Sequence, residues 1–142
     1  MSVRLAGEAF DPWGEIQSFQ SGHPKLAGKF GATAVFVGTM RDFNEGAAVE
    51  AMVLEHYASM TRREIEKICA QAVSRWEILD VLVVHRHGPL APNDPIVLVA
   101  VWSAHRDAAF AACRFVIDEL KTRAPFWKQE QTGAGQRWVA PE

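Results

Sequence analysis

Apolar residues are arranged along the chain in two kinds of pattern, which predict strands and helices respectively. The segments 32–40 (ATAVFVGTM) and 95–102 (PIVLVAVW) are mostly apolar and rich in β-branched residues, and the segment 80–87 (DVLVVHRH) contains the apolar run VLVV. Runs of this length and composition are typical of strands, and the first is expected to be buried and to end near Gly38. The segment 50–57 (EAMVLEHY), in which apolar and polar residues roughly alternate, predicts another strand.

Two longer segments have apolar residues at helical spacing. In the segment 61–76, Thr61 and Glu64 have the spacing of a capping box at a helix start. The apolar stripe of that helix would consist of Ile65, Ile68, Ala72 and Val73. The segment 103–123 predicts the longest helix, and Pro125 is expected to end it because proline cannot continue a helix and restricts the residue before it.

Shorter elements complete the expected secondary structure. Asp11 followed by Pro12 predicts a short helix to about residue 19, because Asp caps free N–H groups and Pro suits the first turn. The remaining expected elements are a strand at 3–5, a loop at 41–48 with turn residues Asn44 and Gly46, a turn at 88–94, and a hairpin of strands 126–130 and 136–139. Residues 1–142 are therefore expected to form one α+β domain, in which two main helices pack on an antiparallel-rich layer of strands and the hairpin adds a small β subdomain.

Composition and charge narrow the class of protein. Of the 142 residues 49% are hydrophobic and 23% are charged, and the net charge is −2. These values are typical of a soluble domain and not of a general nucleic-acid binder. The two cysteines, Cys69 and Cys113, are too sparse for a disulfide framework or a zinc site and fit a reducing cytosol. Because no segment is apolar enough for a signal peptide or a membrane span, we expect a cytoplasmic protein.

A cationic cluster occurs where the predicted long helix begins. Ser103 can cap the helix, and the free N–H groups and dipole of the first turn favour an anion there. Arg106 can donate two hydrogen bonds to one phosphate, and His105 precedes it. These residues predict a phosphate site, although a capped helix with solvated Arg and His side chains has the same sequence pattern.

A second cluster surrounds the end of that helix, in the sequence KTRAPFWK (121–128). If Pro125 turns the chain, Lys121 and Lys128 can come close together, and Phe126 would share a strand face with Lys128. An amine that is partly desolvated beside other cations releases its proton more readily and becomes a competent nucleophile or general base. The alternative is that basic residues in a last helical turn only complement the helix dipole.

Other polar residues allow weaker functional interpretations. Gly38 at a strand end would let the backbone approach a ligand, with Arg41 in the following loop, but an ordinary strand exit with a surface arginine is favoured. His85 and His87 lie on one face of a predicted strand and could bind a metal, but no third ligand is evident. Cys113 lies among small apolar residues at helical spacing, as expected of a buried residue rather than a nucleophile.

Four segments carry a resemblance to a known family. The segments LEHYASMT (54–61), VVHRHG (83–88), SAHRDAAF (103–110) and LKTRAPFWKQE (120–130) closely resemble the large subunit of molybdopterin synthase, in the same order and spacing. The similarity covers residues 30–139, and KTRAPFWK is its most specific part. The resemblance implies an α/β hammerhead fold, a central homodimer of this subunit within a heterotetramer, and sulfurtransferase activity.

The family's reaction implies two partners besides a second copy of the chain. A small ubiquitin-like sulfur carrier, whose C-terminal Gly-Gly is a thiocarboxylate, inserts its tail into the catalytic pocket. The carrier gives its sulfur to cyclic pyranopterin monophosphate, and two rounds build the dithiolene of molybdopterin in molybdenum cofactor biosynthesis. Because the sulfur arrives on the carrier, the resemblance implies no catalytic cysteine and neither a cofactor nor a metal.

Site residues follow from the positions that match the family's motifs. The resemblance implies that Lys121 and Lys128 are the catalytic lysines. It also implies that the substrate is bound by Thr39, Met40, Arg41, His105, Arg106, Gln129 and Glu130. The chain departs from the family pattern at Gln129, which is often basic, after Val139, where relatives have a basic tail, and at the turn with Pro89 and Asn93. Because Asn tolerates the left-handed conformation, we expect that turn to survive.

Two other functions fit the residues without the resemblance. A non-catalytic module could dock a ubiquitin-like tail or a phosphorylated small molecule, and a Schiff-base lyase could use Lys121. Trapping by borohydride with a carbonyl substrate would favour the lyase. Sulfur transfer from a thiocarboxylated carrier would favour the synthase.

Overall fold

The computed structural model describes residues 1–44, 46–56, 58–124 and 126–139, apart from the side chains of residues 47, 55, 56, 58 and 126–129. Its elements are, in chain order, β1 (Ser2–Ala6), α1 (Pro12–Gly22), the 3-10 helix η1 (Pro24–Leu26), β2 (Ala32–Thr39), β3 (Phe43–Asn44), β4 (Ala47–His56), α2 (Ala58–Arg75), β5 (Asp80–Arg86), β6 (Gly88–Leu90), β7 (Pro95–Ser103), α3 (Arg106–Arg123), β8 (Phe126–Thr132) and β9 (Gly135–Val139). Within the described residues no helix combines the length and the apolar character needed to cross a membrane.

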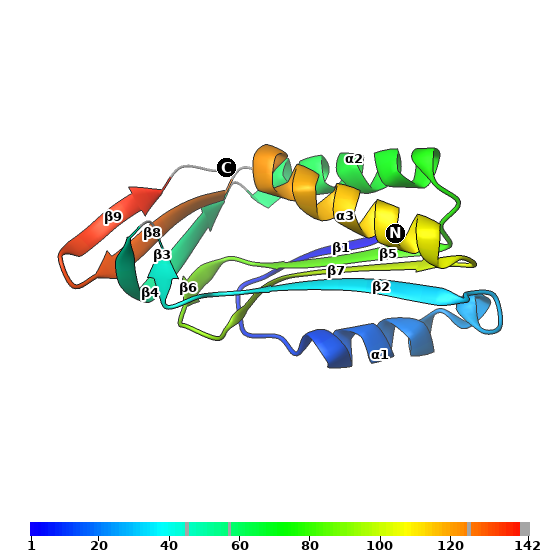
Figure 1. Ribbon diagram of the computed structural model, residues 1–142, viewed down its shortest axis with the longest axis horizontal. Helices are drawn as coiled ribbons and strands as arrows, with labels where there is room; N and C mark the ends of the chain where they lie inside the picture. Colours follow the sequence, from blue (N-terminus) through cyan, green and yellow to red (C-terminus); the bar gives the residue numbers. More distant parts are fainter. Residues whose placement is uncertain (45, 57, 125, 140–142) are drawn as a thin grey trace.

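The strands form two sheets rather than one layer with a separate hairpin. The first sheet has the order β1–β5–β7–β2 and is antiparallel except for the pair of β1 and β5. The second sheet has the order β3–β4–β8–β9, with β6 paired to β4. In Figure 1, α2 and α3 lie side by side on one face of the first sheet and α1 lies on the other, while the second sheet stands at the end where α3 finishes. The predicted α+β class with two main helices and a small extra β subdomain is confirmed.

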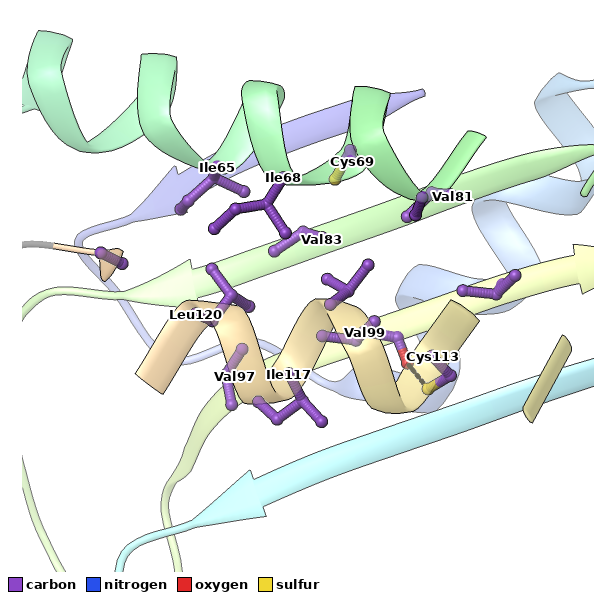
Figure 2. Close-up of a cluster of buried hydrophobic side chains, with 14 of the residues drawn as sticks. Ile65, Ile68, Cys69, Val81, Val83, Val97, Val99, Cys113, Ile117 and Leu120 are labelled. Atoms are coloured by element: carbon purple, nitrogen blue, oxygen red, sulfur yellow. Dashed lines mark hydrogen bonds between the residues drawn. The ribbon is translucent and has the colours of Figure 1, made fainter. Parts of the chain in front are cut away.

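The middle stretches of the central strands β5 and β7 are apolar because helices cover both faces of the first sheet. Along β7, the side chains of Val97, Val99 and Val101 belong to the core cluster that includes residues of α2 and α3. The alternate residues Leu98, Ala100 and Trp102 pack with Phe19 of α1. Figure 2 shows the first cluster, in which labelled side chains of α2 and α3 meet those of β5 and β7. Each large aliphatic side chain buried in this way contributes roughly 1.5–3 kcal/mol to stability.

Helix α2 begins one turn earlier than the sequence pattern indicates. Thr61 therefore lies inside the helix, is fully buried, and its hydroxyl makes no hydrogen bond within the described part of the chain. The predicted capping box is wrong, and Glu64 instead forms an ion pair of 2.7 Å with Arg123 of α3. The predicted stripe was also wrong at Val73, which is 49% exposed, whereas Cys69 is fully buried. Position 69 continues the row of Ile65 four residues on and so faces the sheet.

Helix α3 begins three residues later than expected. Ser103 is the last residue of β7, and its hydroxyl donates a hydrogen bond of 2.8 Å to the carbonyl oxygen of Glu77, so it does not cap the helix as predicted. The N-cap is His105, whose side chain makes no capping hydrogen bond. The helix ends at Arg123 as expected, but Pro125, which the sequence predicts to end it, lies outside the described residues. Tyr57, the last residue of the strand predicted over 50–57, also lies outside them.

The second sheet contains strands that the sequence pattern did not indicate. The segment expected as a loop holds β3, which pairs with the first residues of β4 across a turn in which Gly46 has φ +79°. The turn expected at 88–94 begins with β6 and ends at Asn93, whose φ of 76° confirms that this residue adopts the left-handed conformation. The predicted terminal hairpin is confirmed as β8 and β9.

Candidate active site

A cavity of about 240 Å³ lies between the second sheet, the last residues of β2, the first residues of β7 and the last turns of α3. Most of its wall is apolar and comes from Phe36, Gly38, Met40, Phe43, Met52, Leu54, Ile96, Val97, Ile117, Leu120 and Ala124. Among the described residues, the polar side chains that line it are those of Thr39, Arg41, Asn44, His85, Lys121 and Glu130. An apolar cavity on which a few polar groups converge is the usual form of a small-molecule site.

The end of β2 delivers Thr39, Met40 and Arg41 to this cavity. A bulge lies between Gly38 and Thr39, and a Cβ atom at Gly38 would stand 2.9 Å from the side chain of Val97, so a larger residue would require that side chain or the strand to shift. The backbone of Met40 is held on both sides, because its N–H donates to Asp94 and its carbonyl oxygen accepts from Asn93, each at 2.9 Å. Arg41 therefore leaves a fixed strand end and projects from it as an exposed side chain.

Lys121 reaches the cavity from the last turn of α3, between the buried residues Leu120 and Ala124. Its neighbour Arg123 points elsewhere and pairs with Glu64 and Glu119, and the hydrogen bond with Glu64 raises the pKa of its guanidinium. In contrast, neither Lys121 nor Arg41 takes part in an ion pair among the described residues. The cavity thus has two cations whose charges are not neutralised by a carboxylate in the described structure.

The acidic residue of the cavity, Glu130, is neutralised by a partner of its own. Glu130 is 3% exposed, and its Oε1 accepts a hydrogen bond of 3.0 Å from Nε of Arg137 on β9. Its Oε2 accepts one of 2.9 Å from the side-chain amide of Asn44 on β3. Sequence reasoning did not find this network, because Asn44 lies 86 positions from Glu130 and 93 from Arg137, and no local pattern joins residues so far apart.

The other residues implied by the resemblance divide into two groups. The backbone of Lys128 in β8 pairs with Leu54, whose side chain lines the cavity, but the side chains of Lys128 and Gln129 lie outside the described residues. His105 and Arg106 are exposed at the first turn of α3 and do not line the cavity. At a rise of 1.5 Å per residue, the helix places Arg106 about 22 Å from Lys121 along its axis. One chain therefore does not bring the two predicted cationic clusters together.

The weaker candidates have structural surroundings of their own. His85 lines the cavity, and its Nδ1 donates to the carbonyl oxygen of Arg86 at 2.8 Å. The described residues contain no group of three side chains arranged to hold a metal ion. Burial raises the pKa of the Cys69 thiol to about 12 and that of the Cys113 thiol to about 11. Both cysteines are buried, which confirms the expectation for Cys113 and makes both weak nucleophiles near neutral pH.

Comparison with known proteins places the chain among its relatives. Residues 8–123 match the family described as MoaE protein. The chain is 50% identical to the molybdopterin synthase catalytic subunit of Pseudomonas aeruginosa over an alignment of 139 residues. This alignment covers 98% of this chain and 90% of the relative. The structure of the molybdopterin biosynthesis MoaE protein from Burkholderia ambifaria superposes with a TM-score of 0.81 at 48% identity, over 99% of this chain and 89% of the other. A chain from the complex of subunits 1 and 2 of the molybdopterin-converting factor of Helicobacter pylori has the same fold, with a TM-score of 0.79 at 20% identity over 96% and 89% of the two chains.

Proposed function

Because the chain belongs to the MoaE protein family, we propose that it is the catalytic subunit of a molybdopterin synthase and acts as a sulfurtransferase. The sulfur donor is a small ubiquitin-like subunit whose Gly-Gly tail ends in a thiocarboxylate. The acceptor is cyclic pyranopterin monophosphate. Each transfer forms a carbon–sulfur bond on the pterin side chain and breaks a carbon–oxygen bond there, while water hydrolyses the acyl–sulfur bond of the carrier, so that the carrier tail ends in a carboxylate. Two transfers make the dithiolene.

The observation that carries the proposal is the composition of the cavity. It joins five of the residues that the resemblance assigns to the site, namely Thr39, Met40, Arg41, Lys121 and Glu130. Both substrates are anions, since one brings a cyclic phosphate and the other a thiocarboxylate. Arg41 and Lys121 supply positive charge without a neutralising carboxylate in the described structure, and an apolar wall strengthens their attraction for anions.

Lys121 and Lys128 are proposed as the catalytic lysines. Lys121 extends from the last turn of a helix whose inner residues Ile117 and Leu120 are buried in the core, so its starting point is rigid. A fixed amine at a mainly apolar cavity can orient the carrier tail and transfer a proton during the attack of sulfur. Arg41, with its planar donor fork, is suited to the phosphate group.

His105 and Arg106 are proposed to reach the substrate from a second copy of the chain. They lie about 22 Å along α3 from Lys121, so they and Lys121 of the same chain do not bind one small substrate together. A symmetric dimer in which the N-terminal end of α3 in one copy approaches the cavity of the other would complete the cationic site twice. We infer that the central homodimer implied by the resemblance has this arrangement.

The proposal is tested by mixing the protein with thiocarboxylated carrier and cyclic pyranopterin monophosphate and assaying for molybdopterin. Carrier that ends in an ordinary carboxylate is the control and should give no product. Lys67→Ala is a matched variant because Lys67 is an exposed lysine of α2 outside the cavity, and it should retain full turnover. Absence of product from the folded wild-type protein, together with binding of either ligand, would instead support a non-catalytic docking module.

A further inference from the structure

Arg137 connects three strands of the second sheet at the edge of the cavity. From β9, its Nε donates to the carboxylate of Glu130 on β8 at 3.0 Å, and its Nη2 donates to the backbone carbonyl oxygen of Asn44 on β3 at 2.5 Å. Asn44 closes the triangle by donating its side-chain amide to Glu130 at 2.9 Å. Glu130 and Asn44 line the cavity, whereas Arg137 does not.

We propose that Arg137 is a positioning residue for binding of the pterin precursor. It holds the segment that carries Arg41 against the cavity, and it neutralises a buried carboxylate that would otherwise repel an anionic substrate. The inference rests on the proposed function for the identity of that substrate.

The position of Asn44 explains how Arg137 acts at a distance. Asn44 lies three residues after Arg41, in the short strand β3, which has two residues and pairs only with the start of β4 in the described sheet. A strand of this length has few backbone hydrogen bonds, so its position depends on side-chain contacts. The segment 41–44 is held at both ends. The backbone hydrogen bonds of Met40 fix its start, and the two bonds that Asn44 makes with Arg137 and Glu130 fix its end.

The charge of Glu130 explains why the partner must be a cation. Each carboxylate oxygen of Glu130 accepts one of the bonds described, from Arg137 and from Asn44, so the carboxylate anchors these two residues. A carboxylate that is 3% exposed and has lost its guanidinium partner is a poorly compensated buried charge. Such a charge would face the space in which phosphate and thiocarboxylate are proposed to bind.

The test compares Arg137→Gln with Arg4→Gln, which removes a partly exposed Arg–Glu ion pair between β1 and α1, outside the cavity lining. For Arg137→Gln we expect kcat/KM for the precursor to fall about tenfold to a hundredfold, the scale of a small misplacement of a binding group, chiefly through KM. The KM for the carrier should stay within threefold of wild type.

Arg137→Lys should recover only part of the loss, because one ammonium group does not reproduce the fork that reaches both Glu130 and Asn44. The double variant Glu130→Gln, Arg137→Gln should bind the precursor more tightly than Arg137→Gln alone, since it removes the uncompensated charge.

A second measurement keeps the inference separate from the proposed function. Hydrogen exchange of peptides covering residues 41–44 should become faster in Arg137→Gln and stay unchanged in Arg4→Gln, whether or not the wild-type protein makes molybdopterin. Unchanged exchange in Arg137→Gln, or a precursor KM equal to that of Arg4→Gln, would overturn the positioning role. A double variant no better than Arg137→Gln would overturn the electrostatic part. Failure of the wild-type protein to turn over the precursor counts against the proposed function, and faster exchange would still support the role of Arg137 in holding the segment.

Discussion

The two ends of α3 carry cations in opposite surroundings. At the C-terminal end, Lys121 extends into a cavity formed by strands of both sheets. At the N-terminal end, His105 and Arg106 are exposed, and they are absent from that cavity's lining. Both ends have the sequence of an anion site and both carry exposed cations, yet only at the first end does the described part of the chain form a cavity beside its cation. A cation beside a helix end therefore forms an anion-binding site only where other parts of the protein build a cavity around it. For the N-terminal end of α3, we infer that a second copy of the chain supplies these parts.

The largest effect is expected at the end of α3 that adjoins the cavity. Lys121→Ala should lower the rate of sulfur transfer by roughly 10²–10⁴-fold, the range for loss of a group that transfers a proton in the transition state. The midpoint of thermal unfolding should remain close to that of the wild type, because an exposed lysine in the last helical turn contributes little packing. Single-turnover assays and a thermal melt measure the two quantities.

Arg123→Gln provides the control on the same helical turn. It removes the ion pairs with Glu64 and Glu119, so it should lower the free energy of unfolding by about 1 kcal/mol while leaving the chemical step intact. Near-normal turnover by a correctly folded Lys121→Ala protein would exclude Lys121 from catalysis.

The second prediction joins the two ends of α3 through the proposed dimer. Lys121→Ala and Arg106→Ala should each be impaired alone, but subunits mixed and allowed to exchange should regain activity. In a symmetric dimer, half of the randomly mixed pairs are hybrids and each hybrid has one intact site, so about a quarter of wild-type activity should return. Native mass spectrometry, which separates the hybrid from both parent dimers by mass, verifies that exchange has taken place. No recovery in exchanged dimers would show that each site uses its own copies of both residues, or that Arg106 is not part of it.

The third prediction concerns which ligand each end binds. Arg41→Ala and Arg106→Ala should each weaken binding of the pterin precursor by about 1.5–3 kcal/mol, the value of a charge-assisted hydrogen bond. Carrier docking should change little, because a protein interface depends on a larger surface. Calorimetric titration with each ligand separately measures both effects. Equal losses for the two ligands would indicate that these arginines bind the carrier tail instead.

The smallest effect is expected away from both ends, at the cysteines. The double variant Cys69→Ala, Cys113→Ala should form product at the wild-type rate, with at most a lower melting temperature from trimming buried side chains. Loss of product by several orders of magnitude in a folded variant would require a cysteine relay.

The thiols also predict a pH dependence of stability. Burial raises their pKa from 9.0 to about 12 for Cys69 and about 11 for Cys113, so an unfolded chain ionises them before the folded one. This contribution to stability is therefore complete below pH 9 and is lost as the pH rises through the folded values. Denaturant titrations of the wild type and the double variant between pH 8 and pH 10.5 measure it, and a difference between them that does not change with pH would contradict it.

The elements predicted correctly from the sequence are those whose signals are local. The apolar runs within β5 and β7 result from burial on both faces, and Asp11 caps α1 by accepting from the N–H of Trp13. The errors arose where distant residues decide. Ser103 stays in the sheet because it bonds to Glu77, and β3 exists because the chain returns as β4.

The candidate site shows the same division between local and distant signals. The resemblance marked Arg41, Lys121 and Glu130, and the cavity contains all three. The bond from Arg137 to Asn44 spans 93 positions, and a pattern of neighbouring residues does not reveal it. The separation of Arg106 from Lys121 could have been anticipated, since both were expected on one helix of known rise.

The order of strand pairing has a consequence for synthesis of the protein. The first strand, β1, pairs with β5, whose residues leave the ribosome long afterwards, and β2 likewise waits for β7. The strand β4 pairs with β8, which is made after β5 and β7, so Leu54 in the wall of the cavity meets Lys128 only after all strands of the first sheet have been synthesised. Pairing between strands so distant in the chain is slow and leaves apolar strands uncovered in the meantime. All strands of the first sheet are therefore available before β8 and β9, and the cavity can form only once the second sheet has its strands.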